Sequence, residues 1–474
     1  MRKRFLLLGI GLLLIILTGC NEKPLNNNES KNPLIEGEEE INSQKRPVEI
    51  LTAVTGGKDF EENELWEQEV ERLSGIAINI RKISGSSYNA KVTTTVAAGE
   101  NVDLIYMNTD IFESLYQLHL FMPLTEQIMN SSVLGDFSLI PLEEWNRIRA
   151  DDGEIYAVFN KYEGGRLPLI RWDWLENLGL EAPQNMEEYY QVLKAFTYDD
   201  PDGNGIDDTY GITSKNIYDI QPFMGSAGLV DGYAKEEDGD WYIPYATQEA
   251  IPVYEWLAKL YKEGIYDPNF ATNSSSNCRE AVLTGRVGLF VYWDNWTGIF
   301  NQKAISTNPD TPFEIRGIQP PVGQNGEASL TKGQDGLWVI PTYSEEKESA
   351  FKFLEFLHTY EGTIVCTLGI EGYDYEKKDG QYILTDIGRS HAMDHGIVQP
   401  KSQKWTLPID APKNYLQSKE IILSYGKNEV IRSTSKAAEE IVTKYAVKAI
   451  LGSISSEEAV QAMQEELALR GYID

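Results

Sequence analysis

The chain has 474 residues, and its 73 Asp and Glu outnumber its 42 Lys and Arg, so the formal net charge is −31. Nucleic-acid-binding proteins and polybasic membrane-surface proteins need a positively charged face, so this charge argues against both classes. The 42% of hydrophobic residues is enough for packed cores, and three cysteines are too few for a disulfide scaffold.

The first twenty residues have the pattern of an export signal. Basic residues at positions 2–4 precede an apolar run over 5–17, and Leu-Thr-Gly-Cys then ends at Cys20. This order is typical of a secretory signal peptide, and a bilayer span would need about 20 apolar residues. Residues 17–20 resemble the bacterial lipobox. That resemblance implies that 1–19 are removed and that a lipid on Cys20 anchors the chain to the extracellular face of the cell membrane. An ordinary signal with an incidental cysteine is the alternative.

Residues 20–46 are rich in Asn and Glu and predict a disordered tether. From residue 47, apolar patterns alternate between strand and helix. Strands are predicted over 48–54, 76–83 and 102–106, and helices over 65–73, 88–98 and 111–120. This alternation predicts βαβ units and a parallel sheet, hence an α/β fold. Ligands bind at the carboxyl ends of such strands, which makes Tyr106 and Asn108 candidate ligand contacts.

A second region is predicted to begin near residue 161. Two extended segments flank Gly164 and Gly165, and a helix over 174–178 follows, capped by Asp173 and ended by Gly179. The tail is predicted to be helical over 437–447 and 457–469. The His pair at 391 and 395 has the spacing of zinc ligands but no third ligand, so it is predicted to lie in a solvated loop.

The segment 200–209 reads Asp-Pro-Asp-Gly-Asn-Gly-Ile-Asp-Asp-Thr. Oxygen-bearing residues on alternate positions of a Gly-containing loop match the spacing of an EF-hand-type calcium loop. Position 12 is Gly211, where an EF-hand has a bidentate Glu, so Thr209 or a distant carboxylate must complete the shell. We therefore predict a structural Ca²⁺ site, with a metal-free Asx turn as the alternative. Its predicted ligands are Asp200, Asp202, Asn204, Ile206 through its carbonyl, Asp208 and Thr209.

The sequence Trp293-Asp294-Asn295-Trp296 follows an apolar strand. Flat aromatic rings can cover the C–H faces of sugars, and neighbouring carboxylate and amide groups can bond to sugar hydroxyls. Trp293, Asp294 and Trp296 are therefore candidate ligand contacts. The alternative is a tryptophan pair in a core or at a domain interface.

The mature chain resembles the bacterial extracellular solute-binding proteins of family 1, the lipoprotein receptors of carbohydrate ABC importers, and in layout the alginate-oligosaccharide-binding proteins. The segments that carry the resemblance, besides the lipobox, are 102–106, 171–180, 200–211, 283–288, 336–341 and 369–375. It implies a two-lobed, periplasmic-binding-protein-like (type II) fold with a hinge between the lobes. It also implies that a carbohydrate binds in the interlobe cleft, and it adds Arg171 as a candidate contact.

The same resemblance implies how the chain is divided and what it meets. Lobe 1 would comprise 47–160 and 315–360, and lobe 2 would comprise 161–314 and 361–474 with the C-terminal helices. The expected partners are a carbohydrate, the permease subunits of an ABC transporter and, through the lipid anchor, the membrane. A monomer that binds no nucleic acid is expected. Calcium is the expected cofactor.

Two other functions remain open at this point. A lipid-anchored, calcium-dependent glycosidase would need two carboxyl groups roughly 5–10 Å apart across the scissile bond, and 73 acidic residues allow many such pairs. A sensor subunit that presents a ligand to a membrane kinase is the other alternative. The chain has no Gly-x-Ser-x-Gly, no phosphate-binding Walker loop and no Gly-x-Gly-x-x-Gly. A binding protein, rather than an enzyme, is therefore predicted.

Overall fold

The computed structural model describes residues 46–53, 60–83, 85–395 and 399–474. The predicted signal peptide, Cys20 and all but the last residue of the predicted tether lie outside these residues. From Arg46 to Asp474 the chain forms one compact unit. No helix in the described ranges combines the length and the apolar character that a membrane span requires.

The first sheet has five strands in the order β2-β1-β3-β12-β4. β1 pairs in parallel with both β2 and β3, which confirms the parallel βαβ arrangement predicted from the sequence. β12 runs antiparallel to β3 and β4, and comes from a part of the chain about 230 residues after β3. The strands are β1 Val48–Thr52, β2 Ile78–Lys82, β3 Leu104–Asn108, β4 Ala157–Phe159 and β12 Gly336–Val339.

Helices pack around this sheet to form the first core. Val70 and Val92 from two helices, Leu104 from β3 and Val339 from β12 are each at most 1% exposed and belong to one cluster. Val365 of a later helix joins the same cluster. The helices of this lobe are α1 Phe60–Ser74, α2 Gly85–Ala98, α3 Thr109–Tyr116, α4 Thr125–Asn130, α5 Leu142–Arg147, α12 Lys347–Leu357 and α13 Tyr360–Thr367.

The second sheet is built around β5, all seven residues of which are buried. Its order is β15-β11-β5-β9-β6, and β10 also pairs with β5. β5 is antiparallel to β9, β10 and β11, so this sheet is mixed rather than parallel. The strands are β5 Gly165–Arg171, β6 Tyr210–Thr213, β9 Val287–Trp293, β10 Ile315–Gly317, β11 Leu330–Lys332 and β15 Gly426–Lys427.

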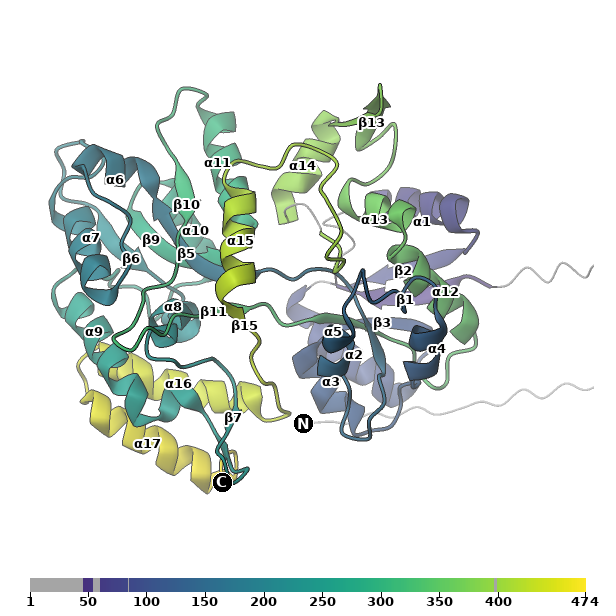
Figure 1. Cartoon of the computed structure of the whole chain (residues 1–474), viewed down its shortest axis with the longest axis horizontal. Helices are drawn as coiled ribbons and strands as arrows, with labels where there is room; N and C mark the ends of the chain where they lie inside the picture. The colour runs from purple at the N-terminus through teal and green to yellow at the C-terminus, as the bar shows by residue number, and fades with distance from the viewer. Residues whose placement is uncertain (1–45, 54–59, 84, 396–398) are drawn as a thin grey trace, which may run out of the picture. The chain divides into compact units, whose positions relative to one another are not determined.

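The helices of the second lobe enclose a larger core. α16 and α17 lie side by side and contact α9 (Figure 1). The predicted tail helices are confirmed, with longer bounds. The helices are α6 Trp172–Leu178, α7 Met186–Tyr198, α8 Gln221–Gly225, α9 Ile251–Lys262, α10 Ser275–Leu283, α11 Trp296–Thr307, α15 Tyr415–Tyr425, α16 Ser435–Ile450 and α17 Ser456–Leu469, with the short 3₁₀ turns η1 Asn216–Asp219, η2 Pro244–Ala246 and η3 Gln248–Ala250.

Local sequence signals set several helix ends. Ser274 and Ser455 begin α10 and α17 with capping boxes, in which the serine accepts from the third residue of the helix and that residue's side chain accepts in return. Gly179 ends α6 at φ +64°, as predicted. Glycine is favoured there because it has no β-carbon to strain the left-handed conformation. The sequence predicts that Asp173 caps α6, and the structure shows that it does not. It lies within the first turn, and Arg171 occupies the cap position.

Further predictions differ from the observed arrangement. The sequence predicts that lobe 2 resumes at residue 361, but Val365 of α13 packs in the core around the first sheet. The sequence predicts a return to the first lobe at residue 315, but β10 and β11 pair with β5, so the chain rejoins the first sheet only at β12. The pattern of apolar residues cannot distinguish which sheet a short strand will join.

The loop predicted around the two histidines is instead the helix α14, Asp386–His395. It follows the hairpin of β13 Tyr375–Lys378 and β14 Gln381–Leu384; a smaller hairpin joins β7 Ala234–Lys235 to β8 Trp241–Tyr242.

Candidate functional site

The carboxyl end of β3 presents Tyr106 and Asn108. The Tyr106 ring meets the ring of Trp338 edge-on, with centroids 5.4 Å apart. The Asn108 side chain accepts a hydrogen bond from the Ile111 N–H at 3.2 Å and so caps α3. Its amide donates to the Gln334 side chain at 3.4 Å. Asn108 therefore has a structural role at this edge of the sheet, whatever else it contacts.

Two of the predicted contacts, Tyr106 and Trp293, come from different sheets and approach a common neighbour, Glu163. A β-carbon at Gly336 would lie 2.8 Å from the Tyr106 hydroxyl and 2.6 Å from Glu163 Oε1. A β-carbon at Gly333 would lie 2.8 Å from Trp293 and 3.1 Å from the Glu163 β-carbon. The two glycines thus allow Tyr106 to approach the Glu163 carboxyl group and Trp293 to approach the backbone and β-carbon of the same residue.

Glu163 is only partly satisfied: its Oε2 atom lies 3.8 Å from Lys161 Nζ, and the Gly336 N–H also favours its charged form. Burial raises the pKa of its carboxyl group, although Lys161 and Lys401 act in the opposite direction. Its Oε1 atom is buried and has no hydrogen-bond partner among the described residues. A buried acceptor without a donor costs free energy unless a ligand or water supplies one. No local pattern in the sequence pointed to Glu163, since it is one acidic residue among many in a loop.

Asp294 is 2% exposed and lies against the turn that begins β5. The Tyr162 hydroxyl donates to it at 3.3 Å, and its own N–H donates to the Gly165 carbonyl at 3.0 Å. A β-carbon at Gly164, where φ is +74°, would lie 2.3 Å from Asp294 Oδ1, so this turn requires glycine. Burial raises the pKa of Asp294 to about 6, against the opposing effect of backbone N–H donors.

Trp296 packs as a hydrophobic residue. Its ring lies 5.4 Å from those of Tyr292 and Phe300, and the Arg279 guanidinium lies over it at 4.8 Å. Trp293 and Trp296 both pack against the same buried cluster of the second lobe and are only partly buried. Trp296 as a sugar contact stays a prediction, alongside the core role left open by the sequence.

Arg171 lies at the other end of β5 from Trp293. Trp293 is the register partner of Arg166, and five residues of strand span roughly 17 Å. Arg171 is 6% exposed, and its guanidinium donates to both oxygens of Asp173 at 2.8 and 2.6 Å. It also lies over the rings of Trp174 and Phe313. The structure does not bring Arg171 together with the other predicted ligand contacts.

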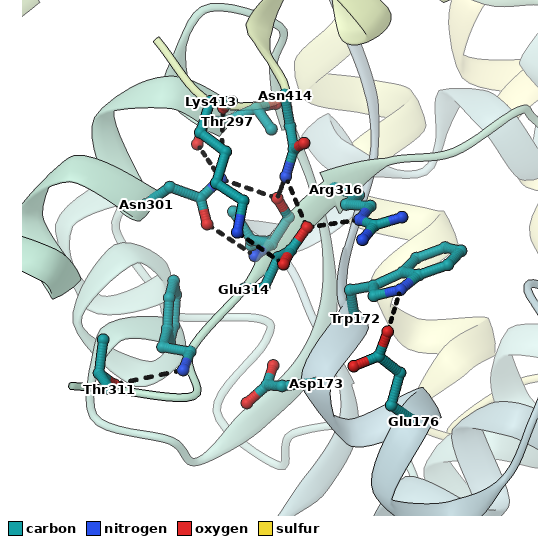
Figure 2. A network of polar contacts seen from close by, with 12 residues as sticks. Trp172, Asp173, Glu176, Thr297, Asn301, Thr311, Glu314, Arg316, Lys413 and Asn414 are labelled. Atoms are coloured by element: carbon teal, nitrogen blue, oxygen red, sulfur yellow. Dashed lines mark hydrogen bonds and ion pairs between the residues drawn. The ribbon is translucent and has the colours of Figure 1, made fainter.

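A dense polar network surrounds this end of β5 (Figure 2). The Glu314 carboxylate accepts from Arg316 at 2.6 Å, from Lys413 at 2.7 Å and from Asn414 at 3.1 Å. These donors lower the pKa of Glu314 to about 2, although burial opposes them. The Asn301 side-chain amide donates to the Ile315 carbonyl at 2.9 Å and accepts from the Ile315 N–H at 3.0 Å. The network joins α11, β10 and the start of α15 and has a structural role.

The predicted calcium loop is exposed and organised by its own backbone. The Asp200 carboxylate accepts from the N–H groups of Asn204 and Gly205, each at 3.0 Å. Asp202 accepts from the Asn204 amide at 2.9 Å. Asp200, at φ +47°, and glycines at φ +67° and +75° give the loop its tight turns. The side chains of Asp200, Asp202 and Asn204 therefore gather around one short stretch of backbone.

Thr209 does not fit the predicted ligand set. It is 5% exposed, and its hydroxyl donates to the Phe196 carbonyl at 2.8 Å, away from the loop. Within the described residues, no group of three or more His, Cys, Asp or Glu side chains is placed to hold a metal ion. The loop as described has the spacing of a calcium loop, but its carboxylates have not converged on one point.

Comparison with known proteins decides the family. A family model for bacterial extracellular solute-binding proteins matches residues 57–364, which is more than half of the chain. The chain belongs to this family. The family resemblance and the two-lobed α/β fold predicted from the sequence are thereby confirmed.

This solute-binding protein is similar to one curated relative over nearly its full length and to another over about two thirds of the chain. It is 25% identical to lipoprotein LipO of Bacillus subtilis strain 168, over 100% of this chain and 94% of that protein. It is 26% identical to the polygalacturonan/rhamnogalacturonan-binding protein YtcQ of the same organism, over 65% of this chain and 63% of YtcQ. Its fold matches the crystal structure of the alginate-binding protein AlgQ2 without calcium ion at a TM-score of 0.67, with 19% identity over 90% of this chain and 95% of AlgQ2.

Proposed function

We propose that this protein binds a carbohydrate, most simply an oligosaccharide, between its two lobes and delivers it to an ABC importer. The observation that carries the proposal is the approach of Tyr106 from one sheet and Trp293 from the other to Glu163. Aromatic rings close to an acidic residue have the chemistry of a sugar site, because the rings can cover C–H faces while the carboxyl group can accept from hydroxyls.

The relatives support the choice of ligand. YtcQ is named for binding polygalacturonan and rhamnogalacturonan, and AlgQ2 for binding alginate. All three are polysaccharides. A receptor of this kind makes and breaks no covalent bond. A ligand that contacts both lobes favours the conformation in which both contacts exist, and hinge closure would present that conformation to the permease subunits.

Titration calorimetry with a panel of oligosaccharides, followed by chromatography of the recovered sugar, tests this function. Binding heat with intact sugar is expected. Trp293→Ala should weaken binding by roughly five- to thirtyfold, because stacking on one ring contributes roughly 1–2 kcal/mol. A matched control is Trp172→Ala, which changes a partly buried tryptophan at the far end of β5. Cleavage of the sugar would establish the glycosidase instead, and a panel with no binding heat would reject a carbohydrate receptor.

The proposal includes anchoring through Cys20 at the extracellular face of the membrane. Its support is the lipobox-like sequence together with the relative LipO, which is named as a lipoprotein. Cells grown with a radiolabelled fatty acid should incorporate label into the wild-type protein and not into Cys20→Ala. Cys278→Ala is the control, since this cysteine is buried. Label that persists in Cys20→Ala would reject the anchor.

We also propose that the 200–208 loop binds Ca²⁺ through Asp200, Asp202, Asn204, the Ile206 carbonyl and Asp208, without Thr209. The ligand spacing and the exposed carboxylates support this, and the description of AlgQ2 as calcium-free points to calcium in a protein of the same fold. EDTA should lower the melting temperature and Ca²⁺ restore it, since a ligand that binds only the folded state stabilises it. Asp202→Ala should abolish this response and Asp238→Ala, in another exposed turn, should not. An unchanged melting temperature in EDTA would reject the site.

A further inference from the structure

Arg166, near the start of β5, connects the Trp293 ring to a second aromatic ring. The arginine is 4% exposed and is the register partner of Trp293, and its guanidinium carbon lies 5.8 Å from the centre of the Trp293 ring. The same carbon lies 3.5 Å from the centre of the Tyr218 ring, and the guanidinium donates to the Tyr218 carbonyl. An ion pair with Asp219 at 3.1 Å fixes the arginine in this place. One buried side chain therefore contacts the rings of both Trp293 and Tyr218.

Tyr218 also lines a pocket of the second lobe that none of the ligand contacts predicted from the sequence lines. The wall is formed by η1, by residues between 231 and 245 and by one face of α16. Tyr233 and Tyr245 contribute two further rings, and Asp231 and Glu439 contribute carboxyl groups. An apolar and aromatic wall with a few polar groups is typical of a ligand site.

Two buried polar groups in and beside this pocket have no partner. Tyr245 is 4% exposed, and its hydroxyl makes no hydrogen bond within the described part of the chain. Gln221 is 2% exposed, and its side-chain oxygen likewise has no partner there, although its amide nitrogen donates to the Tyr218 carbonyl. A buried polar group without a partner costs about 1–3 kcal/mol, so both groups point to partners that a ligand or water would supply.

The carboxyl groups of the pocket suit a ligand with many hydroxyl groups. Burial raises the pKa of both Asp231 and Glu439, although Arg166 opposes the shift in each case. Burial thus favours the neutral carboxyl group, which can donate a hydrogen bond as well as accept one. A sugar hydroxyl can do the same, with these carboxyl groups and with the Tyr245 hydroxyl. The pocket therefore matches the hydroxyl groups that neutral sugars and uronic acids share.

Resting on the proposed function, we propose that this pocket is a second sugar subsite, so that one oligosaccharide places one unit on Trp293 and another in the pocket. Arg166 joins the two subsites, because it contacts the rings of Trp293 and Tyr218. The centres of these rings are no farther apart than the sum of their distances to the guanidinium, so units of one short chain can reach both. Once the first unit is bound, the second is held near its own subsite, and affinity rises with chain length until both subsites are filled.

Oligomers of one to four 1,4-linked units test the dependence on chain length by titration calorimetry. The probes are four series, built from galacturonic acid, mannuronic acid, galactose and glucose. In any series that binds, the tetramer should bind at least roughly tenfold tighter than the monosaccharide. A monosaccharide that binds as tightly as its tetramer would overturn the second subsite and leave the carbohydrate receptor intact. If no member of any series binds, the proposed function itself fails.

Tyr245→Phe removes the unpaired hydroxyl and little else. It should weaken binding of the tetramer by roughly five- to tenfold, the loss of one hydrogen bond to a ligand, without lowering the melting temperature of the free protein. Tyr242→Phe is the matched control, because it removes the same group from a nearby tyrosine outside the pocket. Unchanged affinity in Tyr245→Phe, or an equal loss in the two variants, would contradict the assignment.

Trp293→Ala and Tyr245→Phe, measured with both ends of a series, distinguish two subsites from one. The monosaccharide can fill only one subsite, so its affinity should fall in no more than one of the two variants. The tetramer spans both subsites, so its affinity should fall in each variant. A monosaccharide that is weakened by both changes would show that a single sugar unit contacts both residues, and the pocket would then have no subsite of its own.

Discussion

The two ends of β5 each bury an arginine, but the surroundings of the two side chains differ. At one end Arg171 bonds to both oxygens of Asp173. The nearby Glu314 carboxylate has three donors, from Arg316, Lys413 and Asn414 (Figure 2). At the other end Arg166 pairs with Asp219, yet a buried tyrosine hydroxyl and an oxygen of Gln221 have no partner in the described ranges. Polar groups that are satisfied within the protein stabilise it, whereas unsatisfied ones are available to a ligand. The Arg171 end also has such groups, since Arg171 Nη1 and the nearby Trp174 indole nitrogen have no partner in the described ranges. Its two paired carboxylates, Asp173 and Glu314, nevertheless make it the structural end of the strand.

The largest expected effect is at the structural end. Arg171→Met should lower the free energy of unfolding by about 3–5 kcal/mol, because it leaves the Asp173 carboxylate buried without its partner. Denaturant unfolding measures the loss. The affinity of the folded variant for its sugar should match the wild type. Weakened binding with unchanged stability would restore Arg171 as a ligand contact and break the comparison.

Glu314→Gln should cost about 2 kcal/mol near neutral pH, as it weakens three hydrogen bonds to a charged acceptor. The folded-state pKa of Glu314 is lowered to about 2 from an ordinary value of 4.5, so its contribution is present above pH 4.5 and is lost as pH falls towards 2. Unfolding measured at pH 7 and pH 3 should therefore show a smaller difference between variant and wild type at pH 3. Glu280→Gln, at an exposed position without a side-chain partner in the described contacts, is the control.

Asp294→Asn should have the opposite pH dependence. Burial raises the pKa of Asp294 to about 6 from 3.8, so its contribution to stability is fully present below pH 3.8 and is lost as pH rises through 6. The variant lacks this loss, and its stability relative to wild type should rise by about 1–2 kcal/mol between pH 4 and pH 7. A flat difference across this range would show that Asp294 titrates normally.

The smallest effect is expected for Tyr245→Phe in the free protein. Its free energy of unfolding should stay within about 0.5 kcal/mol of wild type or rise, because the lost hydroxyl has no partner in the described structure. Tyr254→Phe, which removes a buried hydroxyl bonded at 2.7 Å, should cost about 1 kcal/mol. Equal losses in both variants would mean that the Tyr245 hydroxyl is already satisfied.

Much of the fold could be predicted from the sequence, because its signals are local. Alternating apolar patterns predicted β1 to β3 and their helices, and Gly179 predicted the end of α6. The sheet that β10 and β11 join could not be predicted, because partners are chosen through contacts across about 150 residues. For this reason the sequence placed the return to the first lobe at residue 315, whereas the chain rejoins the first sheet at β12.

The candidate site was harder to predict than the fold. Tyr106 and Trp293 could be predicted as ligand contacts because each lies towards the carboxyl end of an apolar strand. The structure brings both towards Glu163. Glu163 had no distinguishing pattern, since its character comes from burial and from neighbours distant in sequence. Arg171 was selected by its place in a family-like motif, but its guanidinium is hydrogen-bonded to both oxygens of Asp173.

The place of β12, α16 and α17 in the two cores limits the order in which the chain can fold. The first sheet needs β12 between β3 and β4, and the second core includes Val460, Met463 and Leu467 of α17. Neither lobe can finish folding as the N-terminal part of the chain emerges, because each awaits a segment made much later. A chain that leaves the cell N-terminus first would therefore cross the membrane incompletely folded. Loss of even the last fifteen residues should expose apolar surface in the second lobe to proteases.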